Sequence, residues 1–314
     1  MPTFSLIIPV KPGGFVAAVE HVMNLMAVEP WYEIILAEGN APSQQRNRAA
    51  EAAGGDILFF LDDDSLVQPG NFARCADAMV NPSVAVVGGP SITPDRDSWL
   101  QKLFGYALAS PFGSGGVRNR YRIQGSVRPT TDKELILCNL AVRRSVFLAL
   151  GGFNERLYPN EENEFMERVV SAGHTLIHEP TMAVYRSQRS TLKAFIRQMF
   201  SYGRGRGEQT LLTSSWSVTS FIPLLFVLYL ALLPVAMGIS ALLIIPLLCY
   251  LAGALVASLA VLLSSGRLSA ILLPVLFPLM HLSNGIGLLW GLLRGKPAPR
   301  RCGALQIRKL KALG

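Results

Sequence analysis

The chain has 314 residues, half of them hydrophobic, with a mean hydropathy of +0.35 and a formal net charge of +8. This composition is too apolar for an ordinary soluble enzyme and too polar for a protein made of membrane spans alone. Because basic residues gather beside the apolar C-terminal segments, they indicate a membrane surface and argue against nucleic acid as a partner. The cysteines show no metal-ligand spacing, which indicates reduced structural thiols: Cys75, Cys138, Cys249 and Cys302.

The first part of the chain alternates strand-like and helix-like segments. Strands are expected at the short apolar runs Phe4–Pro9, Glu33–Ala37, Asp56–Leu61 and Val84–Val87. Helices are expected between them, at Phe15–Ala27, Ser43–Ala53 and Asn71–Val80. This alternation predicts an α/β domain with a mostly parallel sheet, in which ligands bind at the carboxyl ends of the strands. Pro9, Glu38 and Asp62–Asp64 all fall at such ends.

The run ILFFLDDDS, residues 57–65, is an apolar strand that ends in three aspartates. The two-residue period of a strand points Asp62 and Asp64 to one side and Asp63 to the other. Neighbouring carboxylates repel each other unless a cation lies between them and a ligand, and Mg²⁺ and Mn²⁺ commonly share such oxygens with substrate phosphates. The alternative is a solvated acidic turn that caps the next segment.

The second half of the soluble part is less regular. A strand is expected at Leu137–Val142 and a short helix at Ser145–Leu150, followed by a helix from about Glu162 to Ala172. Glu161 and Glu162 fall in the first turn of this last helix, where the helix dipole stabilises negative charge. The two acids therefore serve either a reaction or simple charge complementarity at the helix start.

The C-terminal third contains three apolar runs, Thr219–Met237, Ile239–Leu263 and Leu268–Leu293, which are typical of membrane-spanning segments. The N-terminal apolar run is too short for a signal peptide, so we expect the preceding domain in the cytoplasm. Basic flanks on both sides require an even number of crossings, and we expect two, with the third run re-entrant or interfacial because it contains Pro274, Pro278, His281 and Asn284. Three crossings with an exported tail are the alternative. The flanking basic residues are Arg186, Arg189, Lys193, Arg197, Arg204, Arg206, Arg294, Lys296, Arg300, Arg301, Arg308, Lys309 and Lys311.

Several motifs in the same order resemble the family-2 glycosyltransferases, and in particular membrane-anchored bacterial enzymes of the succinoglycan and exopolysaccharide type. They are LIIPV, QQRNRAAEAAGGDILFFLDDDS, LCNLAVRRSVFLALGGFNE, NEENEFMERVVSAGHTLIHEP and RSTLKAFIRQMFSYGRGRG. The resemblance implies a GT-A fold, Rossmann-like with a mostly parallel sheet, in residues 1–190. A basic interface linker (191–218), a helical transmembrane region (219–293) and a basic cytoplasmic tail (294–314) would follow.

The resemblance also implies roles for individual residues. Asp64 and Asp62 match the metal-binding DxD pair, with Asp62 on the nucleotide side, and Glu162 matches the general base of an acidic pair with Glu161. Glu38 stands where the family has an aspartate that contacts the nucleoside. The family's Gln-x-x-Arg-Trp element corresponds to Gln198 through Tyr202, where Ser201 and Tyr202 replace Arg and Trp, and Arg204 is a candidate for the missing charge. Further residues matched to the donor site are Pro9, Arg46 and Asp63.

The expected activity is therefore inverting transfer of a sugar from a nucleotide-diphosphate donor, with UDP-sugar as the first candidate, to a lipid-linked acceptor at the bacterial cytoplasmic membrane. A cation, Mn²⁺ or Mg²⁺, would stabilise the departing diphosphate, and a carboxylate would take the acceptor's proton. One alternative is an inactive membrane scaffold, favoured by the departures at Glu38, Glu162 and Ser201. The other is a haloacid dehalogenase-type phosphatase with Asp62 as nucleophile, for which no suitably placed lysine is found.

Overall fold

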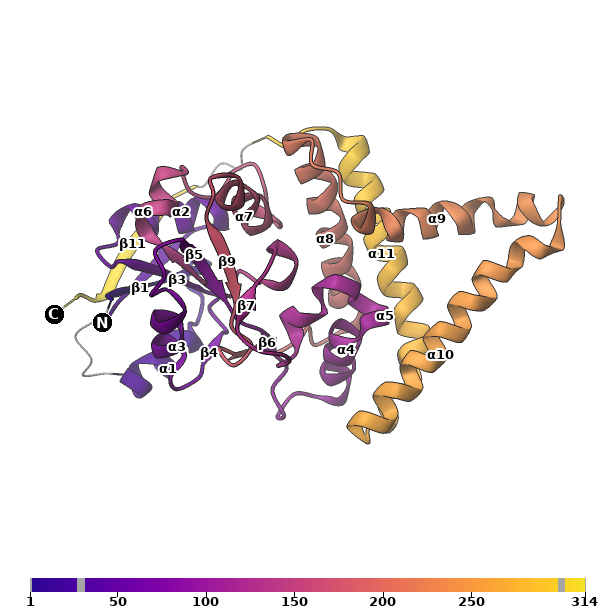
Figure 1. The fold of residues 1–314 in the computed structure, drawn as a ribbon, viewed down its shortest axis with the longest axis horizontal. Helices are drawn as coiled ribbons and strands as arrows, with labels where there is room; N and C mark the ends of the chain where they lie inside the picture. The colour runs from indigo at the N-terminus through magenta and orange to yellow at the C-terminus, as the bar shows by residue number, and fades with distance from the viewer. Residues whose placement is uncertain (1, 27–31, 299–302, 314) are drawn as a thin grey trace. The chain divides into compact units, whose positions relative to one another are not determined.

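The computed structural model describes residues 2–26, 32–298 and 303–313, in two compact units. The first unit comprises Met1–Pro94, Asn119–Ser187 and Ala298–Gly314, and the second comprises Asp95–Arg118 and Gln188–Pro297 (Figure 1). Two segments fall elsewhere than the sequence predicts, because residues 95–118 join the C-terminal helices and the end of the chain joins the N-terminal domain.

The first unit is built on an eight-stranded sheet with strand order β11-β2-β1-β3-β8-β5-β9-β7. The pairs β1–β2, β1–β3 and β5–β9 are parallel, whereas β8 lies antiparallel between β3 and β5. The expected mostly parallel sheet is confirmed, and each expected strand is present to within two residues. The strand bounds are β1 (Phe4–Val10), β2 (Tyr32–Glu38), β3 (Ile57–Leu61), β5 (Val84–Gly88), β7 (Arg128–Pro129), β8 (Asn139–Arg143), β9 (Thr175–His178) and β11 (Gln306–Lys311). A small second sheet has the order β4 (Leu66–Val67), β10 (Val184–Tyr185), β6 (Ser91–Ile92).

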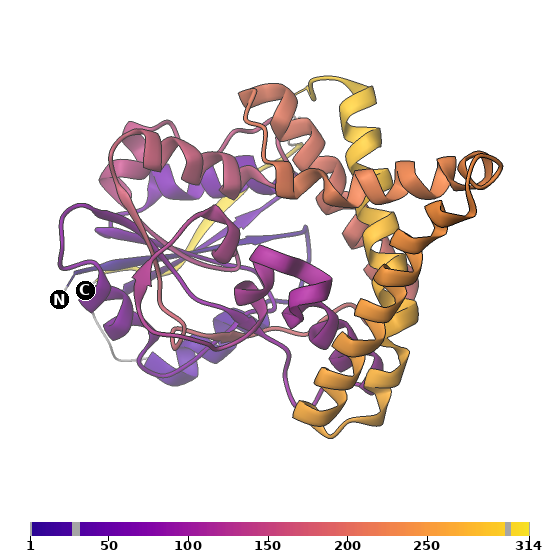
Figure 2. The same ribbon diagram turned by 45° about the vertical axis from the view of Figure 1, so that its right-hand side comes forward.

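Helices cover both faces of the large sheet (Figures 1 and 2). The side chains of the central strands alternate between two hydrophobic cores. On one face Leu6 and Phe59 pack with α1 (Ala17–Met26) and α3 (Asn71–Ala78). On the other face Ile7 and Phe60 pack with α2 (Pro42–Ala52), α6 (Arg144–Ala149) and α7 (Glu161–Ser171). Strands buried on both faces read as continuous apolar runs, which is why they were recognisable in the sequence.

Four phenylalanine rings pack beneath the start of α7. The ring centroids of Phe60 and Phe153 are 5.1 Å apart, those of Phe147 and Phe165 are 5.0 Å apart, and the two pairs also contact each other. Tilted and edge-on aromatic contacts at this spacing add to the free energy gained by burial. The cluster ties α6 and α7 to β3 and so fixes the acidic first turn of α7 against the sheet.

The C-terminal strand β11 corrects the interpretation of the basic tail. It pairs antiparallel with the edge strand β2, with Gln306 opposite Glu38 and Ile307 opposite Ala37. Its basic residues, which the sequence assigned to lipid headgroups, contact the first unit instead: Arg308 lies 3.4 Å from Glu38 and Lys309 lies 2.9 Å from Glu33. Cys302, Arg300, Arg301 and the expected end of the first helix at Ala27 lie outside the described residues. Among the described cysteines, Cys75 and Cys138 are buried and Cys249 is exposed, and all three are free.

The second unit is helical. Among the described residues, three helices are long and apolar enough to cross a membrane: Val218–Met237, Ala241–Ser265 and Leu268–Arg294. They comprise α9 (Val218–Met237), η3 (Ala241–Ile244) with α10 (Ile245–Ser265), and η4 (Leu268–Leu272) with α11 (Leu273–Arg294), and they indicate membrane association. The other helices of this unit named here are α4 (Trp99–Ala109), α5 (Pro111–Ser114) and α8 (Leu192–Thr213), and η1 (Gly115–Tyr121) passes from the second unit to the first.

The third apolar segment is a continuous helix after its first turn, not the irregular segment that its prolines indicated. Pro274 lies in the first turn of α11, where its missing N–H costs nothing, and Pro278 is accommodated inside the helix. The polar residues of α11 are satisfied within the unit, because His281 contacts the Gly113 carbonyl at 3.0 Å and Asn284 donates to the Met199 carbonyl. Glycines of α8 and α11 let the two backbones touch, since a Cβ at Gly203 would collide with the carbonyl of Asn284.

Candidate functional site

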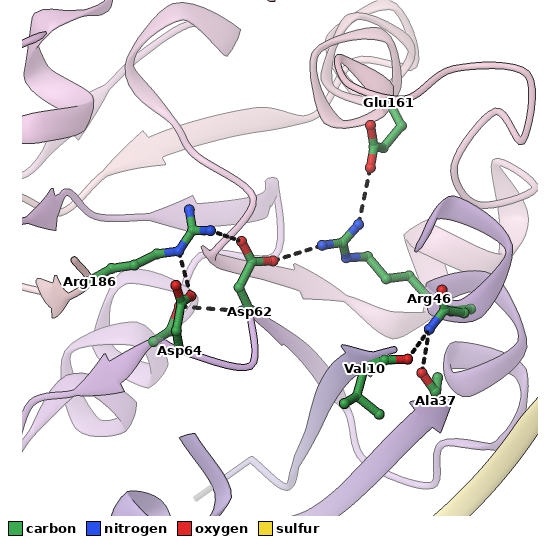
Figure 3. A network of polar contacts seen from close by, with 9 residues as sticks. Val10, Ala37, Arg46, Asp62, Asp64, Glu161 and Arg186 are labelled. Atoms are coloured by element: carbon green, nitrogen blue, oxygen red, sulfur yellow. Dashed lines mark hydrogen bonds and ion pairs between the residues drawn. The ribbon is translucent and has the colours of Figure 1, made fainter. Parts of the chain in front are cut away.

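Two of the three aspartates after β3 face one positive group. The Arg186 guanidinium, after β10, lies with Nε 2.6 Å from Asp64 Oδ1 and Nη2 3.1 Å from Asp62 Oδ2 (Figure 3). A tight turn closed by the Ser65 N–H donating to the Asp62 carbonyl at 3.1 Å orients the run. The expected common direction of Asp62 and Asp64 is thus confirmed, and because strand β4 follows them, the acids do not cap a helix. Burial, together with the charges of Asp64 and Asp62, raises the pKa of the Asp63 carboxyl.

Arg46 joins these acids to the start of α7. It comes from α2, is almost fully buried, and places Nη2 2.9 Å from Asp62 Oδ1 and Nη1 3.0 Å from Glu161 Oε1 (Figure 3). Burial in the first place, and then the charge of Glu162, raises the pKa of Glu161 to about 8, against the opposing effect of Arg46. The second carboxylate oxygen of Glu161 is buried without a hydrogen-bond partner in the described part of the chain. Arg46 is thus a bridge between two acidic motifs that lie far apart in the sequence.

Glu162 lies beside Glu161 in the first turn of α7 and faces a different arginine. Arg120 Nη1 lies 4.0 Å from Glu162 Oε1. Arg120 is itself held by the carbonyls of Lys133 and Asp132, and its Nη2 donates to Asn163 Oδ1 at 2.6 Å. Arg120 lies in η1, and no sequence motif marks it. Glu162 therefore sits against an anchored cation, while Glu161 is locked by Arg46.

Glu38 and Pro9 lie at the carboxyl ends of β2 and β1, as expected. The Gly13 N–H donates to Glu38 Oε1 at 3.1 Å, and Arg308 of β11 approaches Glu38 Oε2 at 3.4 Å. Pro9 is buried within β1. The Gln45 amide donates to the carbonyls of Val10 at 3.0 Å and Ala37 at 2.5 Å, which ties the ends of these two strands together. The loop edge of the sheet is therefore rigid beneath Glu38.

The remaining candidates, Gln198, Tyr202 and Arg204, lie on α8 of the second unit. Gln198 and Tyr202 are one helical turn apart, and the Gln198 amide donates to the Tyr202 hydroxyl at 2.7 Å. Arg204 Nε lies 3.8 Å from Glu208 Oε1 in the same helix, which offsets the positive charge proposed for it.

The acids after β3 have the chemistry that a divalent cation requires of its protein ligands. Asp62 and Asp64 converge on one positive group, and the Asp64 side chain is 47% exposed, so an oxygen ligand is accessible. Within residues 2–26, 32–298 and 303–313 no group of three or more His, Cys, Asp or Glu side chains could hold a metal by itself. A cation with two protein carboxylates takes its remaining ligands from phosphate and water, which is the usual arrangement for Mg²⁺ in phosphate chemistry.

Residues 57–264, more than half of the chain, match the family described as Glycosyl transferase family group 2, and the protein belongs to this family. The pre-mycofactocin glycosyltransferase of Mycobacterium tuberculosis is 26% identical over 162 residues, 52% of this chain and 33% of that protein. The succinoglycan biosynthesis protein ExoA of Rhizobium meliloti is 29% identical over 169 residues, 52% of this chain and 48% of that protein. The chain thus spans less than half of the length of each of these relatives. Membership of this family removes the phosphatase alternative.

A solved structure with a similar fold is the mannosyltransferase PcManGT from Pyrobaculum calidifontis in complex with GDP-Man and Mn²⁺. Its TM-score is 0.52 with 17% sequence identity, and the superposition covers 93% of this chain and 87% of that one. At this identity the likeness establishes the fold alone. The expected GT-A fold, with a mostly parallel central sheet followed by long apolar helices, is confirmed.

Proposed function

We propose that this protein is an inverting glycosyltransferase that moves a sugar from a nucleotide-diphosphate donor to a lipid-linked saccharide or polyprenyl acceptor. The observation that carries the proposal is the continuous series Arg186–Asp62–Arg46–Glu161, which joins the DxD acids to the acidic turn of α7 at one edge of the sheet. Family membership and the GT-A fold support the reaction class. In this proposal the DxD acids hold a cation, and Glu162, next to Glu161 in the first turn of α7, supplies the base.

The donor's nucleoside belongs beside Glu38 in this proposal. Glu38 accepts hydrogen bonds, so it suits a base with an N–H in its ring, which uracil and guanine have and adenine and cytosine in their ordinary forms lack. A UDP-sugar remains our first candidate, and GDP-sugars are the comparison. The Gly13 N–H and Arg308 hold the carboxylate in place from either side.

Asp64 and Asp62 would hold Mn²⁺ or Mg²⁺, which stabilises the negative charge of a departing diphosphate by Lewis-acid action. Arg186 and Arg46 neutralise the charge that these acids carry among themselves. The Glu162 carboxylate takes the proton of the acceptor hydroxyl as that oxygen attacks the sugar carbon. Attack from the face opposite the leaving group inverts the anomeric centre.

We assign the base to Glu162 and a positioning role to Glu161. The Glu161 side chain is buried, bound by Arg46, and has a raised pKa of about 8, so a share of it is protonated at neutral pH. A general base has to be ionised and within reach of the proton it removes. Glu161 instead orients Arg46, and through it Asp62. Gln198, Tyr202 and Arg204 of α8 are kept as proposed donor-side contacts on the family resemblance.

The membrane topology we propose rests on β11. The chain leaves the first unit after Ser187 and returns to it at Ala298, so both ends of the apolar segment attach to one domain. Such a segment crosses a bilayer an even number of times. Little of α9 and α10 is buried (6% and 11% of their most apolar stretches), whereas α11 is 44% buried. We therefore assign the two crossings to α9 and α10. In this topology α11 stays packed along α8 on the cytoplasmic side of the membrane, the side on which the lipid-linked acceptor is used.

The test is transfer from a panel of UDP- and GDP-sugars, with Mn²⁺ or Mg²⁺, to membranes from which the lipid-linked product is extracted. Metal-dependent label in the lipid fraction from one donor supports the proposal. If the protein neither transfers nor hydrolyses the sugar of any donor, the inactive scaffold is favoured. The departures from the family pattern at Glu38, Glu162 and Ser201 are the observation that supports that alternative.

A further inference from the structure

Arg186 is fixed in place by the backbone and not merely by its charge. It directly follows β10, and its N–H donates to the Ile92 carbonyl at 3.0 Å, which extends the pairing of β10 with β6. Its side chain is 20% exposed. The backbone pairing fixes the point from which the Arg186 side chain reaches Asp62 and Asp64, while the guanidinium itself lies at the end of a long side chain that can turn to a nearby partner.

The guanidinium contacts the oxygens that a cation would use. It takes Asp64 Oδ1 at 2.6 Å and Asp62 Oδ2 at 3.1 Å, and the second Asp62 oxygen is bound by Arg46 at 2.9 Å (Figure 3). A divalent ion bound to the same carboxylates places a second cation next to the Arg186 guanidinium, which itself lies within ion-pair distance of Asp62 and Asp64. The two cations therefore compete.

We propose that Arg186 is a resident counter-ion of the DxD acids, which a divalent cation displaces and which then binds the donor's diphosphate. This inference rests on the proposed use of a nucleotide-diphosphate donor. It assigns to Arg186 a role that the sequence, where it looked like a membrane-flanking charge, did not indicate.

The displaced guanidinium has a natural new partner. A planar guanidinium binds phosphate oxygens through two parallel hydrogen bonds, and it remains charged at every working pH. A diphosphate that shares the cation with Asp62 and Asp64 has to lie next to them, which is within reach of a side chain that starts from those same acids. Free metal binds against the competition of Arg186, whereas metal with diphosphate gains Arg186 as a ligand-binding group. The mechanism thus makes metal binding weak alone and strong together with the donor.

The test compares the full-length protein with Arg186→Gln, measuring Mn²⁺ binding without nucleotide by electron paramagnetic resonance and UDP binding at saturating Mn²⁺ by calorimetry. Loss of the competitor should tighten Mn²⁺ binding by about tenfold, since a partly buried charge pair of about 1.4 kcal/mol corresponds to one decade. Loss of the diphosphate contact should weaken UDP binding by about tenfold as well. A residue with a merely structural role would not move the two affinities in opposite directions.

Arg189→Gln is the matched control, because it removes the same charge three positions along the chain from an exposed side chain of the second unit. It should leave both affinities unchanged. Arg186→Lys keeps the positive charge but loses the planar guanidinium with its two parallel donors. Its Mn²⁺ and UDP affinities should lie between those of the wild type and Arg186→Gln. It replaces the glutamine variant in the test if that variant does not fold. Mn²⁺ binding that is no tighter in the folded Arg186 variants overturns the competition, and unchanged UDP binding overturns the transfer to diphosphate. The proposed function is tested separately, by measuring sugar transfer with the wild-type protein.

Discussion

Lys309 and Glu33 form an ion pair between opposite ends of the chain, with Nζ 2.9 Å from Oε2 and the Glu33 side chain only 2% exposed. Glu33 also accepts from the Ser5 hydroxyl and the Gly54 N–H, both at 2.6 Å. Burial raises the pKa of Glu33, but these hydrogen bonds and the charge of Lys309 lower it by more than burial raises it. The pKa of Glu33 is therefore below its ordinary value. The pair joins β11 to the sheet of the first unit, and so ties the chain that follows the apolar helices to that unit.

Lys309→Met should therefore destabilise the first unit. It leaves the buried Glu33 carboxylate with two hydrogen bonds and no cation, which we expect to cost about 1–3 kcal/mol of unfolding free energy. The measurement is denaturant unfolding followed by a probe in the first unit. Lys296→Met, at an exposed position, is the control and should unfold like the wild type. Equal stability of the Lys309 variant and the control would show that β11 is not held by this pair.

The topology predicts a labelling pattern for single cysteines in a background without the native ones. A cysteine at Leu313 should resist an impermeant reagent added outside intact cells, and a cysteine at Ile239, between α9 and α10, should react. The reason is that β11 pairs with β2 and so keeps the chain end with the first unit, while in the proposed topology the turn between α9 and α10 lies on the opposite side of the bilayer. External labelling at Leu313 would contradict the even number of crossings.

The sequence predicted the parallel part of the sheet because its strands are short apolar runs buried on both faces. It could not predict that β8 inserts antiparallel between β3 and β5, since this depends on a long connection and not on a local pattern. Strand β11 was missed for a different reason. Its residues, QIRKLK, are largely exposed and basic, so the run resembles a membrane flank, and its partners Glu33 and Glu38 lie hundreds of positions away.

The candidate site divides in the same way. Asp62 and Asp64 were recognisable because strand and acids are contiguous, and the acidic turn of α7 because it begins a helix. Arg186 was read only as a flanking charge, although it pairs with acids more than a hundred residues earlier. Arg120 carried no motif at all. Such contacts arise from the packing of distant segments, which no local spacing encodes.

Asp64→Ala should abolish sugar transfer and metal-dependent nucleotide binding without unfolding the protein. Its side chain is about half exposed, so the loss falls on the cation site and not on the core. Removing one of two carboxylate ligands should cost several kcal/mol of transition-state stabilisation. Turnover and Mn²⁺-dependent UDP binding are the measurements, with Asp77→Ala, an exposed aspartate of α3, as the control. Wild-type transfer by the Asp64 variant would refute the metal assignment.

Glu161 should make the folded state less stable as the pH rises. Its pKa is about 8 in the folded protein and about 4.3 in an unfolded chain, so between these values the folded state holds a proton that the unfolded state releases. Stability from this group is therefore complete below about pH 4 and declines up to about pH 8. Glu161→Gln, which keeps an oxygen for Arg46, should remove that decline and gain stability relative to wild type toward pH 8. Thermal unfolding from about pH 5 to pH 9 checks this, and parallel profiles of the two proteins would contradict the buried, protonated carboxyl.

Replacement of Glu162 by aspartate examines the geometry of the base. Aspartate keeps the carboxylate but withdraws it by one methylene, and it is the residue that the family carries at this position. Glu162→Asp should retain part of the activity, with the change in kcat and not in donor affinity. A complete loss of turnover with intact donor binding would mean that the arm length of glutamate is required beside Arg120.

The most direct test of the proposed mechanism is the rate of sugar transfer by Glu162→Gln, with the donor affinity determined on the same protein. Glutamine preserves shape and hydrogen bonding but accepts no proton, so kcat should fall by about 10²–10⁴-fold, the usual contribution of general-base catalysis, while donor binding stays nearly unchanged. Glu164→Gln is the companion variant in the same helix, where the native carboxylate pairs with Arg168 at 2.8 Å and has no assigned part in the reaction. Wild-type turnover by Glu162→Gln, together with an inactive Glu161→Gln or Glu164→Gln, would contradict the assignment of the base.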